Sequence, residues 1–205
     1  MCGRYWLEDD LLEISNYFGA RPIDFKDFTR GEVFPTNSAP IITKNVDKIL
    51  EGVDKIILIY KWGFPLQNKA VFNARTETVD KKPFFKDSFI NRRCLAVANA
   101  FFEWKMEGKD KIKYKIKKES KFILFGGIYN SFKVGESIIN AFTILTTSPN
   151  KEMKDLHDRM PLIIDERDID AWLFGDLKEA YRIIDSNHNN KLFFEREENE
   201  QLKWI

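Results

Sequence analysis

The chain has 205 residues, of which 43% are hydrophobic and 14% aromatic. This composition excludes an intrinsically disordered chain and fits one domain of about 100–200 residues. No apolar run approaches the roughly 20 residues of a membrane span, no secretory leader is visible, and two Cys are too few for a disulfide scaffold. We therefore expect one domain over residues 2–205, in the cytoplasm and without a membrane partner.

The charges nearly cancel, since the chain has 33 Lys and Arg and 32 Asp and Glu, which gives a net charge of +1. The total conceals an uneven distribution, because residues 1–60 carry −3, residues 61–160 carry +9 and residues 161–205 carry −5. A basic middle between acidic ends is compatible with a one-sided basic surface for nucleic acid. Lysines that only solvate strand faces are the simpler interpretation.

The first predicted element is a helix over residues 8–18, with acidic residues in its first turn, apolar residues at helical spacing and Gly19 as its C-cap. The β-branched run 55–62 predicts a buried strand. Residues 94–106 predict a further strand that is interrupted near Asn99.

Alternation is clearest over 111–117, where four Lys point to one face and Ile or Tyr to the other. Strands are also predicted at 122–129 and 139–147, and short helices at 150–157 and 165–174. Strands that follow one another over short connections indicate an α+β fold. We expect a mainly antiparallel, barrel-like sheet with a few flanking helices.

Cys2 is the first candidate for chemistry. Its small size permits removal of the initiator Met, which exposes an α-amine of pKa about 7.7–8.0 beside a thiol of pKa about 8.5. The amine of such an aminothiol attacks an aldehyde to form a Schiff base, and the thiol then closes on the imine carbon to form a thiazolidine. Chance placement of a Cys at position two is the alternative. Cys94 is predicted to be a buried core thiol.

Two further segments offer polar side chains. In NARTE, Asn73 and Arg75 share one face of a predicted strand, where the amide can orient a substrate and the guanidinium can hold a phosphate. In FFEW, alternation puts Phe102 and Trp104 on one face and Glu103 on the other. Desolvation would raise the pKa of Glu103 and make it a general acid or base. The alternative for NARTE is a surface loop with an ordinary Arg–Glu pair. The alternative for FFEW is an exposed Glu on a half-buried strand.

The chain has two His. His157, in HDRMP, is a candidate proton shuttle near neutral pH, with a structural His as the alternative. His188 lies in a turn-like segment and is predicted to face solvent. No Cys and His spacing typical of a metal site occurs, and we expect neither a metal nor another cofactor.

Together these segments resemble the SRAP family of SOS response-associated peptidase-like proteins, which process and shield abasic sites in DNA. The resemblance is strongest over residues 2–175. It rests on matches in the family order: MCGRY, the Pro35/Ala39/Pro40 segment, WGFP, NARTET, RRC, FFEW, FGGIY, TTSPN and HDRMP. Phe102 stands where the family usually has Tyr, and residues 176–205 form a divergent tail.

The resemblance implies binding to single-stranded DNA with an abasic site, in some cases at a junction with duplex, and a thiazolidine crosslink through the N-terminal Cys. It implies autopeptidase removal of Met1 and a lyase activity. It also implies a monomer, associated with the nucleoid when bound to DNA, or nuclear in a eukaryote. Carried over to this sequence, the catalytic residues are Cys2, Asn73, Glu103 and His157.

The resemblance likewise implies the DNA contacts. Arg4 and Arg75 are expected to hold phosphates beside the lesion, and Trp62 to pack against a base, with stacking worth about 1–3 kcal/mol. Pro40 and Arg159 complete the expected DNA-binding residues.

Two other functions compete. Class II glutamine amidotransferases, which are N-terminal-nucleophile amidohydrolases, also begin Met-Cys-Gly. They need a Gly-Ile run after the Cys and an Asn-Gly pair, and this sequence has neither. A non-catalytic nucleic-acid-binding module would account for the basic middle and the aromatic residues, and it would form no covalent product.

Overall fold

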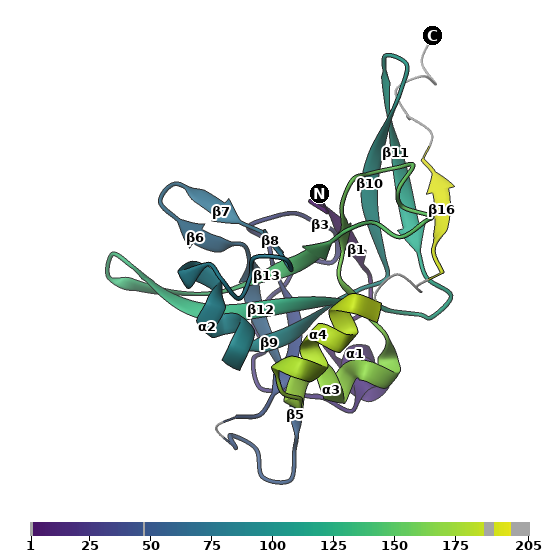
Figure 1. Ribbon diagram of the computed structural model, residues 1–205. Helices are drawn as coiled ribbons and strands as arrows, with labels where there is room; N and C mark the ends of the chain where they lie inside the picture. The colour runs from purple at the N-terminus through teal and green to yellow at the C-terminus, as the bar shows by residue number, and fades with distance from the viewer. Residues whose placement is uncertain (1, 47, 187–190, 198–205) are drawn as a thin grey trace.

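A closed ring of strands forms the centre of the computed structural model, which describes residues 2–46, 48–186 and 191–197 (Figure 1). The ring, here called the barrel, runs in the order β5 (Lys55–Trp62), β4 (Ser38–Lys44), β9 (Arg93–Ala98), β12 (Ile123–Val134) and β13 (Ser137–Thr147). It closes because β13 pairs with β12 on one side and with β5 on the other.

The closure is a parallel pairing in which Ala141 lies opposite Lys61 and Phe142 opposite Trp62. Further along, the same strand β13 pairs in parallel with β8 (Asn73–Arg75). The NARTE segment is therefore attached to the barrel just beyond the point where the barrel closes.

A second sheet, here called the outer sheet, is antiparallel and rises from one end of the barrel (Figure 1). Its strands are β16 (Phe193–Arg196), β11 (Asp110–Lys117), β10 (Ala100–Glu107), β1 (Tyr5–Leu7) and β3 (Gly31–Val33), in that spatial order. The chain passes from the barrel to this sheet at Asn99, between β9 and β10. The interruption predicted near this residue is confirmed.

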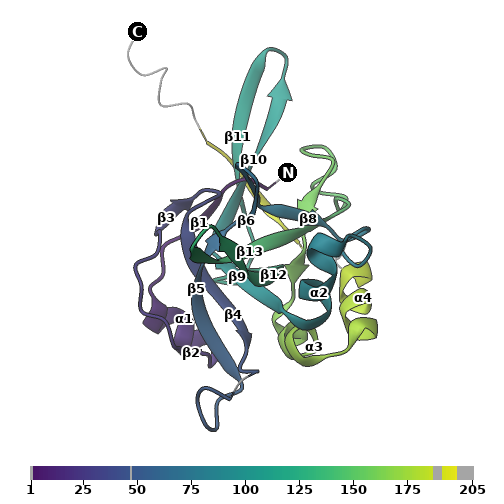
Figure 2. The same ribbon diagram turned by 90° about the vertical axis from the view of Figure 1, so that its left-hand side faces the viewer.

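Smaller elements surround the barrel. The short strands are β2 (Arg21–Pro22), β6 (Phe64–Leu66), β7 (Lys69–Val71), β14 (Met160–Pro161) and β15 (Ile163–Ile164). The helical elements are α1 (Leu11–Phe18), α2 (Pro83–Asn91), η1 (Glu166–Asp168), α3 (Ile169–Phe174) and α4 (Leu177–Ser186). Figure 2 shows α2, α3 and α4 together on one side of the barrel and α1 on the other. The predicted α+β fold with a mainly antiparallel, barrel-like sheet is confirmed.

Local chemistry explains where α1 begins and ends. Asp10 accepts the backbone N–H of Glu13, and the Glu13 carboxylate accepts that of Asp10, which forms a capping box. Gly19 ends the helix in the left-handed region, with φ of 61°. The predicted helix is confirmed, with a start at Leu11 in place of residue 8.

The helix predicted at 150–157 is wrong, because 151–156 form turns. Met153 is buried and Leu156 packs against the core, so the turns bury the two apolar side chains of this segment without a continuous helix. Helices α2 and α4 were not predicted. The strands expected at 55–62, 122–129 and 139–147 are confirmed, and the last two are longer than expected.

Arg93 joins two helix ends to the barrel. Its side chain is buried, 4% exposed, and its guanidinium donates to Phe89 O (3.1 Å), Ile90 O (3.3 Å), Trp172 O (2.7 Å) and Gly175 O. These oxygens belong to the last turns of α2 and α3, where a helix favours a cation. One side chain therefore satisfies carbonyl groups that the helices leave unpaired.

We expect Arg93→Met to lower the free energy of unfolding by about 3 kcal/mol, because four carbonyl oxygens lose their donor. Arg92→Met is the matched control. Arg92 is more exposed and pairs with Asp87 at the surface, so we expect a loss of about 1 kcal/mol or less. Urea denaturation measures both changes, and equal losses would contradict the role given to Arg93.

Candidate active site

Three separate parts of the chain meet around Cys2, where the outer sheet leaves the barrel. Cys2 comes directly before β1, and the Nδ2 group of Asn73 on β8 donates to its carbonyl oxygen at 2.8 Å. Glu103 on β10 and His157, in the loop before β14, complete the group. The four predicted catalytic residues thus lie together, although up to 155 positions separate them along the chain.

The thiol of Cys2 is fully buried. Burial raises the pKa of Cys2, and the negative charge of Glu103 raises it further. The Sγ atom lies 3.9 Å from Arg4 O, which it can reach only as a weak S–H donor. The structure therefore holds the thiol in its neutral form.

Glu103 is 3% exposed, as its position in the FFEW run predicts. Strand alternation places it on the same face as Phe101, whose ring contacts Phe125. Phe102 lies on the opposite face, beneath the ammonium group of Lys113. Burial raises the pKa of Glu103, while the nearby His157 acts in the opposite direction. A carboxyl group in this setting keeps its proton to higher pH and can act as an acid.

The amide of Asn73 has a free acceptor. Its Oδ1 atom is buried and accepts no hydrogen bond from any residue that the structure describes. Since Nδ2 is already bonded to Cys2 O, the orientation of the amide is fixed. An amine N–H that enters the site can therefore donate a hydrogen bond to Oδ1.

His157 is held by its own loop. Its Nδ1 atom accepts the backbone N–H of Arg159 at 3.0 Å and lies 2.8 Å from Asp158 Oδ1. Nδ1 thus lies between a backbone N–H donor and a carboxylate oxygen, and both belong to the two residues that follow His157. The side chain is one-quarter exposed, so protons can reach it from solvent.

The arginines predicted to bind phosphates differ in their exposure and in the partners that they already have. Arg75 is exposed on β8. Arg4 pairs with Glu32 at 3.2 Å and stacks on Phe34 at 4.3 Å and on Trp104 at 5.0 Å. The pairing of Arg4 with a carboxylate was not predicted.

Arg159 makes a two-point contact with Glu77, at 2.6 and 3.0 Å, and also donates to Thr146 O at 2.6 Å. The hydrogen bond from Arg159 lowers the pKa of Glu77. A phosphate that binds this guanidinium must displace the Glu77 carboxylate.

The expectation that Trp62 and Pro40 touch DNA needs correction. Trp62 has no exposed surface, its ring packs on Tyr5 at 5.0 Å, and its indole N–H donates to Phe72 O at 2.9 Å. Pro40 is buried in β4 opposite Ile59. Both residues are buried, so neither presents a surface to a base in this arrangement.

Sequence reasoning missed Tyr5 as part of the site. Its hydroxyl is buried and has no hydrogen-bond partner among the described residues. Burial raises the pKa of Tyr5, and the neighbouring Cys2 raises it further. The sequence signal that could have identified Tyr5 is its place in MCGRY, close to Cys2, at the start of the short apolar segment YWL.

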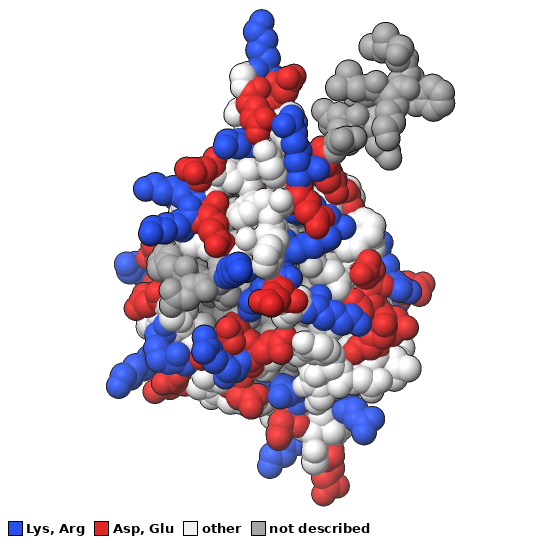
Figure 3. Space-filling view, turned by 90° about the vertical axis from the view of Figure 1, so that its right-hand side faces the viewer, with Lys and Arg blue, Asp and Glu red and all other residues white. Residues whose placement is uncertain are grey.

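Figure 3 shows Lys and Arg interspersed with Asp and Glu, so this face carries no one-sided basic surface. Within the described ranges, no group of three or more His, Cys, Asp or Glu could hold a metal ion. None of the described helices is long and apolar enough to cross a membrane. His188 and Met1 lie outside the described residues.

Known proteins share this fold and sequence pattern. A family model described as SOS response associated peptidase (SRAP) matches residues 1–200, which extends beyond residue 175 into the segment expected to diverge. The abasic site processing protein YoqW of Bacillus subtilis is 35% identical over 188 residues, which cover 84% of this chain and 80% of that protein. The abasic site processing protein HMCES of Xenopus tropicalis is 25% identical, over 73% of this chain and 56% of that protein.

Solved structures agree on the fold. A crystal structure of a protein from Bacteroides thetaiotaomicron has a TM-score of 0.79 at 21% identity, and the match covers 98% of this chain and 94% of that one. A protein from Bordetella bronchiseptica also has a TM-score of 0.79, at 16% identity, over 97% of this chain and all of the other. Because the family model spans nearly the whole chain and a 35% identical relative covers most of it, this chain belongs to the SOS response-associated peptidase (SRAP) family.

Proposed function

We propose that the chain, once Met1 is removed, binds single-stranded DNA at an abasic site and shields the lesion by a covalent bond through Cys2. The observation that carries this proposal is the meeting of Cys2 with Asn73, Glu103 and His157 in one desolvated site. The names of the relatives support the same substrate. The proposed partner is a single strand, alone or at its junction with duplex, and the acting form is a monomer.

The first step joins the α-amine of Cys2 to the aldehyde carbon of the ring-opened sugar. A carbinolamine forms and loses one water molecule to give a Schiff base, with no change in oxidation state. The raised pKa of Glu103 suits it to give the proton that the departing oxygen needs. Oδ1 of Asn73 accepts a hydrogen bond from the amine N–H and so directs the nitrogen lone pair at the carbon.

The second step closes the ring. Sγ of Cys2 bonds to the imine carbon, the imine electron pair moves to nitrogen, and the thiol proton passes to that nitrogen. The raised pKa of Cys2 disfavours a free thiolate in the empty site, so this proton is lost only as the new bond forms. His157, which solvent reaches, exchanges protons during closure and reopening of the ring.

The DNA strand is held through its phosphates. Arg75 is free to bind one, whereas Arg4 and Arg159 exchange the carboxylates of Glu32 and Glu77 for phosphate oxygens. Hydrolysis of the Met1–Cys2 bond by the chain itself, and cleavage of the DNA strand beside the adduct, are the finer activities of this proposal.

Cys2→Ala should abolish the adduct, because it removes the sulfur that closes the ring. Single-stranded DNA with one abasic site is mixed with the mature protein and separated on a denaturing gel. Cys94→Ala is the matched control, since Cys94 is equally buried but lies in the barrel. We expect a shifted band from the wild type and from Cys94→Ala only. Equal yields from the wild type and Cys2→Ala would exclude the proposed mechanism.

Glu103→Gln should slow adduct formation by about 100-fold, the contribution typical of a general acid. Affinity for DNA with a tetrahydrofuran abasic analogue, which has no aldehyde, should stay unchanged. The acid form of Glu103 is lost as pH rises through its raised pKa, so the ratio of wild-type to variant rates should fall as pH rises. A parallel loss of DNA affinity would indicate a structural role for Glu103 instead.

A further inference from the structure

We propose that Asn99 is a positioning residue of the active site: it fixes the register between β1 and β10 and so keeps Cys2, one residue before the position opposite Glu103, beside that carboxyl group. This inference rests on the proposed function, since it concerns the geometry of that reaction. Asn99 touches none of the reacting groups. It acts through the backbone of the two strands that carry them.

The register between the two strands decides which side chains meet. Tyr5 pairs with Phe101 and Trp6 with Ala100. The backbone N–H of Phe102 donates to Arg4 O at 3.0 Å, and the same register continued toward the N-terminus places residue 3 opposite Glu103. A slip of β1 by one residue would shift residues 2–4 along β10 and turn the β1 side chains to the other face of the sheet, while the pairing with β11 keeps Glu103 where it is.

The β1 strand has three residues, and two of them pair with β10. So short a ladder makes few backbone hydrogen bonds to β10, so contacts at its end add to the burial of Tyr5 and Leu7 in holding the register. Asn99 supplies them where the chain leaves the barrel. Its backbone N–H donates to Trp6 O at 2.8 Å.

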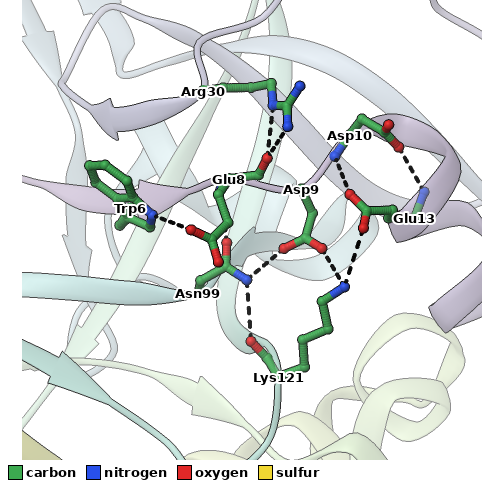
Figure 4. Close-up of polar contacts among 8 residues, drawn as sticks. All are labelled: Trp6, Glu8, Asp9, Asp10, Glu13, Arg30, Asn99 and Lys121. Carbon is green, nitrogen blue, oxygen red and sulfur yellow. Dashed lines mark hydrogen bonds and ion pairs between the residues drawn. The ribbon is translucent and has the colours of Figure 1, made fainter.

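The side chain of Asn99 continues this contact along residues 8 and 9, as Figure 4 shows. Oδ1 accepts the backbone N–H of Glu8 at 2.9 Å, and Nδ2 donates to the Asp9 carboxylate at 2.7 Å and to Lys121 O at 3.3 Å. Asp9 is 3% exposed, and its other oxygen pairs with the ammonium group of Lys121. The amide therefore uses both of its ends, and its orientation is fixed.

The same stretch of chain is held from the other side. Arg30 donates from Nε to Glu8 O at 2.8 Å, and Trp6 donates from its indole N–H to the Glu8 carboxylate at 3.1 Å (Figure 4). At the far end, Asn73 binds Cys2 O. Residues 2–9 are thus fixed at both ends, by Asn73 at the reacting end and by Asn99 at the other.

Asn45 provides a matched control for the bonds that Asn99 makes. Its Oδ1 accepts the N–H of Ile49 at 2.9 Å, and its Nδ2 donates to Leu50 O and Val53 O, both at 2.8 Å. These bonds lie in the connection between β4 and β5, at the end of the barrel away from the outer sheet (Figure 1). Loss of either amide removes one acceptor and two donor contacts, but only Asn99 connects to the active site.

The test compares Asn99→Ala with Asn45→Ala in the mature chain that begins with Cys2. Three quantities are measured well below the unfolding temperature: the adduct-forming rate at saturating abasic single-stranded DNA, the affinity for the tetrahydrofuran analogue, and the hydrogen exchange of the Phe102 amide. In Asn99→Ala we expect the rate to fall on the order of 10-fold or more, since small misplacements of reacting groups cost this much. Its affinity should stay within about twofold, because the DNA ligands are intact.

The Phe102 amide should exchange faster in Asn99→Ala and unchanged in Asn45→Ala, because it reports the bond to Arg4 O directly. Asn99→Asp should also slow the reaction, since it sets a carboxylate against Asp9. Adding Asp9→Asn restores a donor–acceptor pair and should recover the rate.

A folded Asn99→Ala with wild-type rate and wild-type protection of the Phe102 amide would overturn this inference. Equal slowing by Asn45→Ala would overturn it too, because general destabilisation would then suffice. If the wild type forms no adduct, the proposed function fails. The exchange of the Phe102 amide then still decides whether Asn99 sets the register.

Discussion

The pairing of β1 with β10 is the interaction on which the active site depends. It brings Cys2, the proposed first residue of the mature chain, from a terminus that is normally solvated into a desolvated position beside Glu103. Burial raises the pKa of both Cys2 and Glu103, so each keeps its proton to higher pH than it would in water. In the proposed reaction, burial limits side reactions of the thiol, and the carboxyl group donates its proton when an aldehyde enters.

Two of the arginines around the site would have to exchange a carboxylate partner for a phosphate when DNA binds. Arg4 and Arg159 are already paired with carboxylates, so the protein without DNA holds acidic groups where phosphates are proposed to bind. Each phosphate contact then releases an internal ion pair, which reduces the net gain and keeps unspecific binding weak. This explains how a chain of net charge +1 can serve a polyanion. Local arginines matter more than the total charge.

Much of the site was predictable because its signals are local. The aromatic residues of FFEW favoured a desolvated Glu103 over an exposed one, and the interruption predicted near Asn99 coincides with the passage from β9 to β10. The burial of Trp62 was not predictable, because it depends on the parallel pairing of β5 with β13, about 80 residues apart in sequence. The contact between Glu77 and Arg159 is equally remote, and spacing alone gives no sign of it.

The central claim is that Cys2 attaches to the abasic sugar as a closed thiazolidine. Mass spectrometry of the proteolysed adduct, before and after treatment with borohydride, tests it most directly. The account predicts that the N-terminal peptide beginning with Cys2 carries the sugar with loss of one water molecule, and that borohydride adds no hydrogen, since the imine has been consumed. Attachment at a lysine, or a gain of two hydrogens at Cys2, would contradict it.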